Sequence, residues 1–109
     1  MKKIVLTALL LSISVQSYAT EPNNPDKDCV IYSDLAYKIM QRRQAGAPMS
    51  EMLRIAAGDG KHPAVSQVVR AVVIDAYKQT RYSTAEVQED TAADFRDDVL
   101  SACIELHSK

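Results

Sequence analysis

The hydrophobic residues of this chain recur at helical intervals in four successive segments. In segment 29–45 they lie mostly three or four residues apart, at Cys29, Tyr32, Leu35, Ala36, Ile39 and Met40. Segment 51–57 repeats this spacing, and in segment 63–79 one helical face comprises Val65, Val68, Val69, Val72, Val73 and Ala76. The last stripe, which ends near residue 107, comprises Thr91, Phe95, Val99, Ala102, Cys103 and Leu106. The pattern predicts an all-α protein, a compact bundle of about four helices.

One stretch leaves a choice between helix and strand. The β-branched run 68–74 suits a strand, because such side chains have a high strand propensity. Arg70 interrupts the run, however, and the chain contains no second strand-like segment that could pair with it. The helical spacing of segment 63–79 therefore decides for a helix.

Residues that start and stop helices separate the four segments. Gly46 is expected to cap the end of the first helix, and Pro48 prevents the helix from continuing. Ser50 is expected to cap the second helix, which the turn 58–60 stops. Pro63 suits the first turn of the third helix, where its missing amide proton costs nothing.

The start of the last helix has the clearest local signature. Ser83 and Glu86 have the spacing of a capping box, and Tyr82 and Val87 occupy the two positions of a hydrophobic staple. This signature predicts that Ser83 is the residue that caps the last helix.

The N-terminus has the features of a secretory signal. Two lysines precede the apolar run Ile4–Val15, and Ser17 and Ala19 supply the small side chains of a cleavage site. A membrane anchor is the alternative, but a spanning helix needs roughly 20 apolar residues. We therefore expect residues 1–19 to be a signal peptide cleaved near Ala19, and the mature chain to be periplasmic or secreted, without stable membrane insertion.

The remaining chain makes one small domain. Residues 20–28 contain two prolines, two asparagines and no large apolar side chain, and are expected to be a flexible tether outside the core. Residues 29–109 form the single helical domain. Cleavage removes two lysines, which leaves eleven basic and fourteen acidic residues and a net charge of −3. This balance argues against nucleic acid as a partner, because phosphate binding needs a surplus of clustered basic residues.

Two cysteines lie near the ends of the predicted domain. In an oxidising compartment Cys29 and Cys103 are expected to form a disulfide that links the first and last helices. Closing a loop of this length contributes about 4 kcal/mol in the chain-entropy description. The alternative is a redox-active pair or a reactive thiol, but the chain has no Cys-x-x-Cys spacing.

Several short stretches resemble a known group of proteins. They are 35–44 followed by Gly46, 48–50, Met52-Leu53, Ala76-Tyr77 and Arg81–Thr84. Together they are similar to a group of small, exported, largely uncharacterised helical proteins of Gram-negative bacteria and their phages. The resemblance covers most of the mature chain and ends near Cys103. It implies an exported helical domain, and it assigns no activity and no catalytic residue.

No motif for catalysis, a cofactor or a metal stands out. His62 and His107 lack partners at ligand spacing within one element, and His107 is expected to interact with the carbonyl end of the last helix. Four aspartates of the last helix share a face and suggest a loose calcium site, but no glycine-containing loop would wrap the ion. On an exposed helix face nothing would separate the pKa values of paired carboxylates. We expect a protein that is not an enzyme and has no cofactor.

Charge gives the candidate binding surface. The last helix presents Asp90, Asp94, Asp97 and Asp98 on one face. This face is either a solvated surface that keeps the protein soluble or a docking surface for a basic partner. A second candidate surface has Tyr37, Arg42 and Arg81 as binding anchors. For these residues the alternatives are that Tyr37 packs against a neighbouring helix and that Arg81 caps backbone carbonyls.

These features favour a periplasmic helical interaction protein. Within that class we expect an inhibitor, or an immunity or exclusion protein, that acts on an envelope enzyme or phage component, with a basic protein as its partner. A structural or accessory component of an envelope assembly is the first alternative. An enzyme with a dispersed site is the second.

Overall fold

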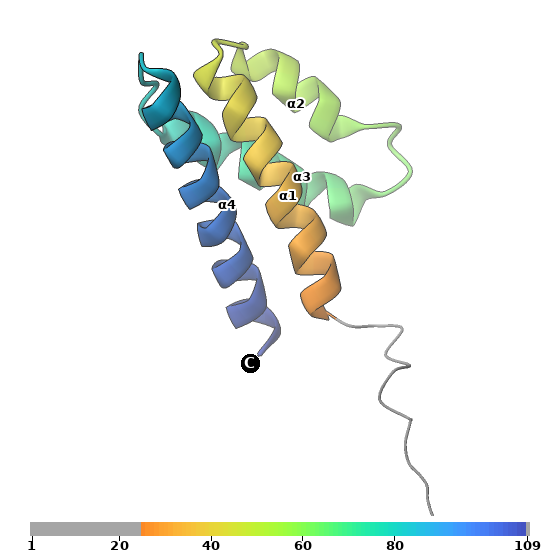
Figure 1. The fold of residues 1–109 in the computed structure, drawn as a ribbon. Helices are drawn as coiled ribbons and strands as arrows, with labels where there is room; N and C mark the ends of the chain where they lie inside the picture. Colours follow the sequence, from red (N-terminus) through yellow and green to blue (C-terminus); the bar gives the residue numbers. More distant parts are fainter. Residues whose placement is uncertain (1–24, 109) are drawn as a thin grey trace, which may run out of the picture.

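A computed structural model describes residues 25–108 of the chain. These residues form four helices and no strand (Figure 1): α1 Pro25–Gln44, α2 Met49–Ala57, α3 Pro63–Lys78 and α4 Ala85–His107. The prediction of an all-α fold with four helices is confirmed, including a helix over the β-branched run 68–74. The predicted signal peptide and the first part of the predicted tether, residues 20–24, lie outside the described residues. No helix within 25–108 combines the length and apolar character needed to cross a membrane.

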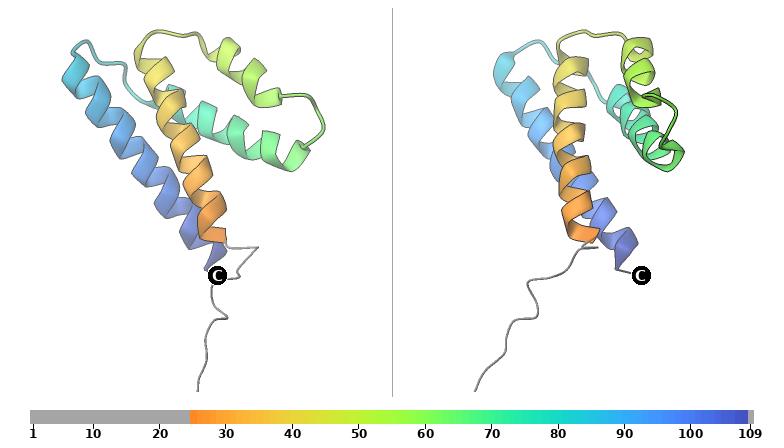
Figure 2. Two further views of the ribbon diagram at one scale, coloured as in Figure 1. Left: turned by 45° about the vertical axis from the view of Figure 1, so that its right-hand side comes forward. Right: turned by 90° about the vertical axis from the view of Figure 1, so that its right-hand side faces the viewer.

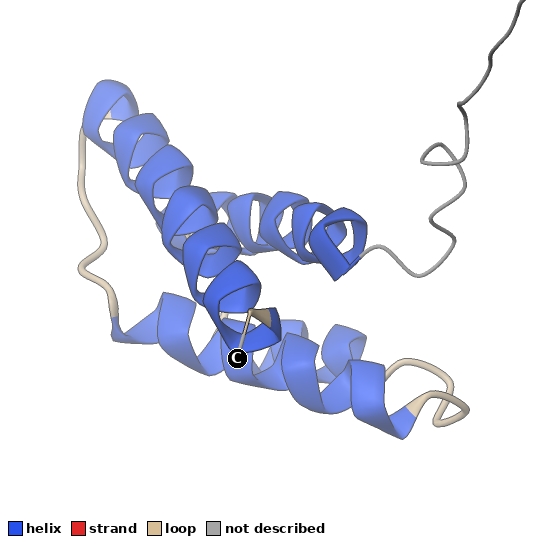
Figure 3. Ribbon diagram, turned by 90° about the horizontal axis from the view of Figure 1, so that it is seen from below, coloured by secondary structure: helices blue, strands red, loops and turns tan. Residues whose placement is uncertain are grey.

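The four helices form two antiparallel pairs. Helices α1 and α4 lie side by side in opposite directions, and α2 and α3 form a hairpin that crosses them, so that the two pairs make two layers (Figures 2 and 3). Helix α1 packs most extensively against α4 and also contacts α3, whereas α2 packs on α3. A disulfide between Cys29 and Cys103 ties α1 to α4, as predicted. Helix α1 is therefore the central element of the bundle.

The core contains side chains from all four helices. Its most deeply buried members are Ala36, Met40, Val73, Ala76 and Ala92. Small residues on α1, α3 and α4 allow the helices to approach closely, and larger side chains complete the cluster: Ile39, Met52, Val69, Val72 and Phe95.

The predicted apolar face of α3 is only partly buried. Val69, Val72, Val73 and Ala76 belong to the core, but Val65 and Val68 are exposed. They lie in the first turns of α3, which extend beyond the crossing with α1 (Figure 2). The spacing of apolar residues correctly predicts which face of α3 is buried, but it cannot predict how far along the helix other helices pack against that face.

Helix α1 begins earlier than expected. The predicted tether included residues 25–28, but these residues form the first turn of α1. The tether prediction is wrong for these four positions. Asp26 and Asp28 stabilise this turn, because a negative charge is favourable near the positive end of the helix dipole. The side chains of residues 26–28 are exposed and so stay outside the core.

The end of α1 follows the prediction. Gly46 has a φ of +96°, its amide donates to the carbonyl of Arg43 at 3.0 Å, and the amide of Ala47 donates to that of Arg42 at 2.9 Å. These two bonds make a Schellman cap. The positive φ is the reason why this position favours glycine; a Cβ atom here would also lie 2.8 Å from Nη2 of Arg81, the flexible end of a side chain that would have to shift.

The start of α2 differs from the prediction. Ser50 is not the cap: the helix begins at Met49, and Pro48 is the N-cap residue. The extended backbone of Pro48 directs its carbonyl into the helix, where the amide of Glu51 donates to it at 3.1 Å. Ser50 is already inside the first turn, so its hydroxyl makes no cap. The turn at Gly58 ends α2, and Pro63 begins α3, both as predicted.

The cap of α4 is one residue later than expected. Thr84, not Ser83, is the N-cap, and its hydroxyl accepts a bond from the amide of Val87 at 3.4 Å. The capping box of Ser83 and Glu86 is therefore wrong. With Thr84 as the cap, the two staple positions fall on Ser83 and Gln88, so the staple prediction also fails.

Candidate functional site

The acidic face predicted on α4 is present and open to solvent. Asp90, Asp94, Asp97 and Asp98 are all exposed. Within the described part of the chain one ion pair reaches this group, between Arg96 Nε and Asp97 Oδ1 at 3.3 Å. Both side chains of that pair are solvated, so its attraction is weak. The face keeps a net negative charge.

Tyr37, a predicted binding anchor, packs against α4. Its hydroxyl donates a hydrogen bond to the carboxylate of Glu89, and the guanidinium of Arg96 lies 5.2 Å from its ring centroid. The hydrogen bond to Glu89 raises the pKa of Tyr37, and desolvation and the negative charge of Glu89 add to the shift. Tyr37 therefore packs on a neighbouring helix, which was the alternative to its role as a binding anchor.

The two predicted arginine anchors also make internal contacts. Arg42 pairs with Glu51 of α2 at 2.9 Å. Arg81 Nε donates to the carbonyl of Gln44, at the end of α1, at 3.1 Å. Arg81 thus caps a backbone carbonyl, the other alternative raised above. Tyr37, Arg42 and Arg81 contact three different elements, and the structure does not bring them together into one site.

An open groove lies between α3 and α4. Its volume is about 530 Å³, and most of its surface is apolar. Tyr32 of α1 lines it together with two sets of side chains from the flanking helices: Val68, Ala71, Val72, Asp75 and Gln79 from α3, and Phe95, Asp98, Val99, Ala102, Cys103, Leu106 and His107 from α4. Leu106 is 74% exposed. The groove exists because α4 packs mainly against α1, which leaves the apolar side that faces α3 uncovered.

A second hollow continues the groove toward the start of α4. It measures about 270 Å³ and shares Gln79, Phe95 and Asp98 with the groove, while Tyr82, Thr91 and Asp94 complete it. Of the four predicted aspartates, Asp94 and Asp98 thus line the groove or its extension, whereas Asp90 and Asp97 line neither. Asp75 adds a carboxylate from the opposite wall, 3.9 Å from the amine of Lys78.

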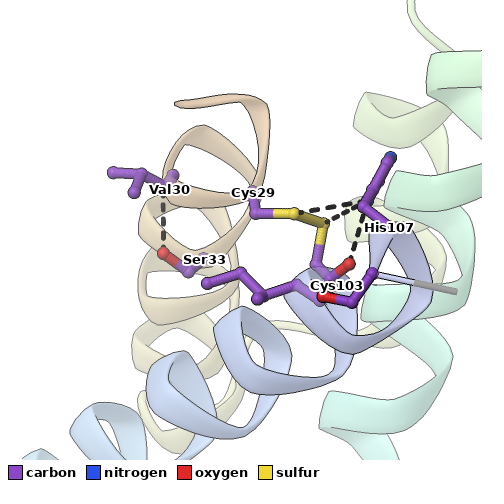
Figure 4. Close-up of a disulfide and its surroundings, with 7 residues drawn as sticks. Cys29, Val30, Ser33, Cys103 and His107 are labelled. Atoms are coloured by element: carbon purple, nitrogen blue, oxygen red, sulfur yellow. Dashed lines mark hydrogen bonds between the residues drawn. A yellow bond between two sulfur atoms is a disulfide. The ribbon is translucent and has the colours of Figure 1, made fainter. Parts of the chain in front are cut away.

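His107 lies beside the disulfide between Cys29 and Cys103 (Figure 4), and Cys103 and His107 line the other end of the groove. Nδ1 of His107 lies 2.9 Å from the carbonyl of Cys103 and 3.7 Å and 3.9 Å from the sulfurs of Cys29 and Cys103. A carbonyl only accepts, so Nδ1 carries the proton in this contact. The expected interaction of His107 with a carbonyl at the end of α4 is confirmed.

These three side chains are also close enough together to suggest a metal site. Ligand-type atoms of Cys29, Cys103 and His107 lie within 4.8 Å of one another, and no other such group occurs among residues 25–108. The two sulfurs are bonded to each other, however, and metals bind the thiolate. In the disulfide form only the imidazole offers a strong ligand, so the cluster does not make a metal centre.

Sequence reasoning missed the groove. It also missed Gln44, a buried polar residue that holds the segment between α3 and α4 in place. Gln44 is 2% exposed, and its side chain bonds both the carbonyl of Thr80 at 2.8 Å and the amide of Tyr82 at 2.7 Å. A signal existed, because Gln44 follows Met40 by four residues and so continues the buried stripe of α1. For the groove, the sequence contains no comparable signal.

Comparisons with known proteins add no relative. The chain matches no protein family, and no curated protein and no solved structure shows significant similarity to it. The resemblance to a group of small exported proteins stays an expectation.

Proposed function

We propose that the protein is a small periplasmic interaction protein without catalytic activity. In this proposal it acts as an inhibitor, or as an immunity or exclusion protein, by binding a basic envelope enzyme or phage component. The binding surface is the exposed acidic face of α4.

One observation carries the proposal: the aspartates of α4 form a solvated face that is barely neutralised. Among the described residues only Arg96 pairs with one of them. Such a face attracts a positively charged surface, raises the association rate and selects against acidic proteins. Two of the aspartates also stand beside an apolar groove, and interfaces commonly combine an apolar centre with a polar rim.

The disulfide supports the proposed compartment. Disulfides form and persist mainly in oxidising spaces such as the periplasm. The bond between Cys29 and Cys103 joins the two longest helices. The signal peptide expected over residues 1–19 agrees with this location.

The test is affinity capture from periplasmic extract with the mature chain as bait, read by mass spectrometry. We expect one dominant basic protein in a one-to-one complex, and loss of the complex at about 0.5 M salt, where charges are screened beyond a few ångströms. The substitutions Asp94→Lys and Asp98→Lys together should abolish capture. Asp34→Lys is the matched control, because Asp34 is an exposed aspartate of α1.

Other results would contradict the proposal. Capture that survives high salt and charge reversal would show that the acidic face is only a solvated surface. Recovery of the bait in a large multi-protein assembly would favour the accessory role instead. Absence of any captured protein would leave the acidic face without a partner and would count against binding as the function.

A further inference from the structure

The groove between α3 and α4, together with its extension, is long enough to hold one helix. With its extension it follows α4 from Thr91 to His107, which corresponds to roughly 24 Å at the rise of an α-helix. Two helices, α3 and α4, form its walls. A partner helix of about four turns would lie along such a groove and present one apolar face to it.

The main part of the groove is apolar, whereas its extension toward the start of α4 is mostly polar. Tyr32, Val72, Phe95 and Val99 line it, and all four are buried or half-buried. At its edges Val68 and Leu106 are exposed. Leucine side chains of a partner would find van der Waals contacts along the lining and would remove these two exposed side chains from water.

The charges around the groove indicate which charge its occupant carries. Asp75 stands on the α3 wall and Asp94 and Asp98 stand on the α4 wall. Of the described residues that line the groove and its extension, none is a lysine or an arginine. A second copy of this chain would place its own aspartates next to the aspartates of the groove, and a fatty acid would place its carboxylate there, so like charges would repel in both cases. Both are disfavoured, whereas lysine or arginine side chains would pair with the aspartates.

We infer that this groove binds an amphipathic helical segment of a partner protein. The segment has leucine-like residues on the face that contacts Tyr32, Val99 and Leu106. It has basic residues along both edges, next to Asp75, Asp94 and Asp98. This inference rests on the proposed function and names the kind of segment that the partner would contribute.

The disulfide keeps one end of the groove in shape. Cys29 and Cys103 fix the last turns of α4 against α1, and Cys103 itself lines the groove. Leu106 and His107 follow within one turn. The bond opposes fraying of this end, because the terminal turns of a helix lack part of their intrahelical hydrogen bonds. The groove is therefore formed before a partner binds.

A designed peptide tests the inference without knowledge of the partner. The probe is a fluorescent 16-residue helical peptide with leucines on one face and lysines on the other, titrated with the mature chain and read by fluorescence anisotropy. We expect saturable one-to-one binding. Leu106→Asp should weaken it by about tenfold or more, because it places a charge where an apolar side chain would be buried. Asp98→Lys should weaken it by about fivefold to tenfold.

Matched variants separate the groove from general charge attraction. Ile31→Asp is the control for Leu106→Asp, because Ile31 is 58% exposed and does not line the groove. Asp90→Lys is the control for Asp98→Lys, because Asp90 belongs to the same acidic face but not to the groove. Both controls should change the affinity less than about twofold. Circular dichroism spectra should show that all four variants keep their helices.

Each contrary result has a definite meaning. The inference is overturned if the peptide does not bind, if a peptide with glutamates in place of the lysines binds equally well, or if the mature chain self-associates through the groove. Equal losses with Asp90→Lys and Asp98→Lys, without a loss with Leu106→Asp, would reject the groove and leave the proposed function intact. Peptide binding in the groove without any captured periplasmic protein would count against the proposed function alone.

Discussion

At the residue scale, Gln44 shows how one polar side chain positions a connection. Its amide group donates to the carbonyl of Thr80 and accepts from the amide of Tyr82, so it satisfies two backbone groups of the segment between α3 and α4. The same segment is held by Arg81, which donates to the carbonyl of Gln44 itself. Buried polar groups contribute little net stability when paired but cost much when a partner is removed.

We predict that Gln44→Leu destabilises the protein by about 2–3 kcal/mol, because it leaves the carbonyl of Thr80 and the amide of Tyr82 without their partner. Urea unfolding followed by circular dichroism would measure the loss. Gln41→Leu is the matched control: Gln41 is exposed on the same helix, and its substitution should change the free energy of unfolding by less than about 0.5 kcal/mol. Equal effects at the two positions would refute the importance of the Gln44 bonds.

Tyr37 and Tyr77 make stability depend on pH in the alkaline range. The bond to Glu89 raises the pKa of Tyr37, and desolvation raises the pKa of Tyr77. A raised pKa means that the unfolded chain loses the phenolic protons first, so the folded state binds more protons above pH 10. The stabilisation is complete below pH 10 and is lost as the pH rises through the folded pKa values.

We therefore predict that the free energy of unfolding falls as the pH rises above about 10, because the two tyrosines have raised pKa values in the folded state. Urea unfolding at a series of pH values measures this slope, and ultraviolet absorbance of phenolate gives the titration of the folded state. Tyr37→Phe should flatten the slope, leaving the part due to Tyr77. A slope unchanged by Tyr37→Phe would disprove the assignment.

At the element scale, the helices could be predicted and their caps could not. The spacing of apolar residues on α1 and α3 correctly gives both helices and the buried sides of both. A cap depends on which of several suitable residues reaches the correct backbone torsions. Ser83 and Thr84 are both good N-cap residues. The bonds of Gln44 to Thr80 and Tyr82 fix the path of the preceding segment, and this long-range contact is invisible in local sequence.

The hydroxyl of Thr84 caps the start of α4, and substitutions at Thr84 and Ser83 test this assignment. Thr84→Ala should destabilise the protein by about 1 kcal/mol, because the amide of Val87 loses its acceptor. Ser83→Ala should have an effect close to zero, since Ser83 precedes the cap. Thermal or urea unfolding of the two variants measures the difference. The reverse order of the two effects would restore the capping box expected from the sequence.

At the scale of the whole molecule, the sequence predicts one part of the candidate site, the acidic face, but not the other part, the groove. The acidic face follows from residue identity alone, because four exposed aspartates at helical spacing share one side of α4. The groove depends on how α3 crosses the α1–α4 pair, and nothing local encodes that crossing. Leu106 was expected on a core-facing stripe, since spacing cannot tell an apolar residue that meets a neighbour from one that does not. The arrangement of helices decides which apolar positions remain open.

The disulfide is the strongest single constraint on that arrangement, because Cys29 and Cys103 are 74 positions apart. We predict that reduction with a phosphine lowers the free energy of unfolding by up to about 4 kcal/mol. Urea unfolding with and without the reductant measures the loss. The double variant Cys29→Ser/Cys103→Ser should be equally destabilised and should not respond to reductant. Hydrogen exchange should rise first at the ends of α1 and α4 that the bond joins. Unchanged stability after full reduction would mean that helix packing suffices to keep the groove in shape.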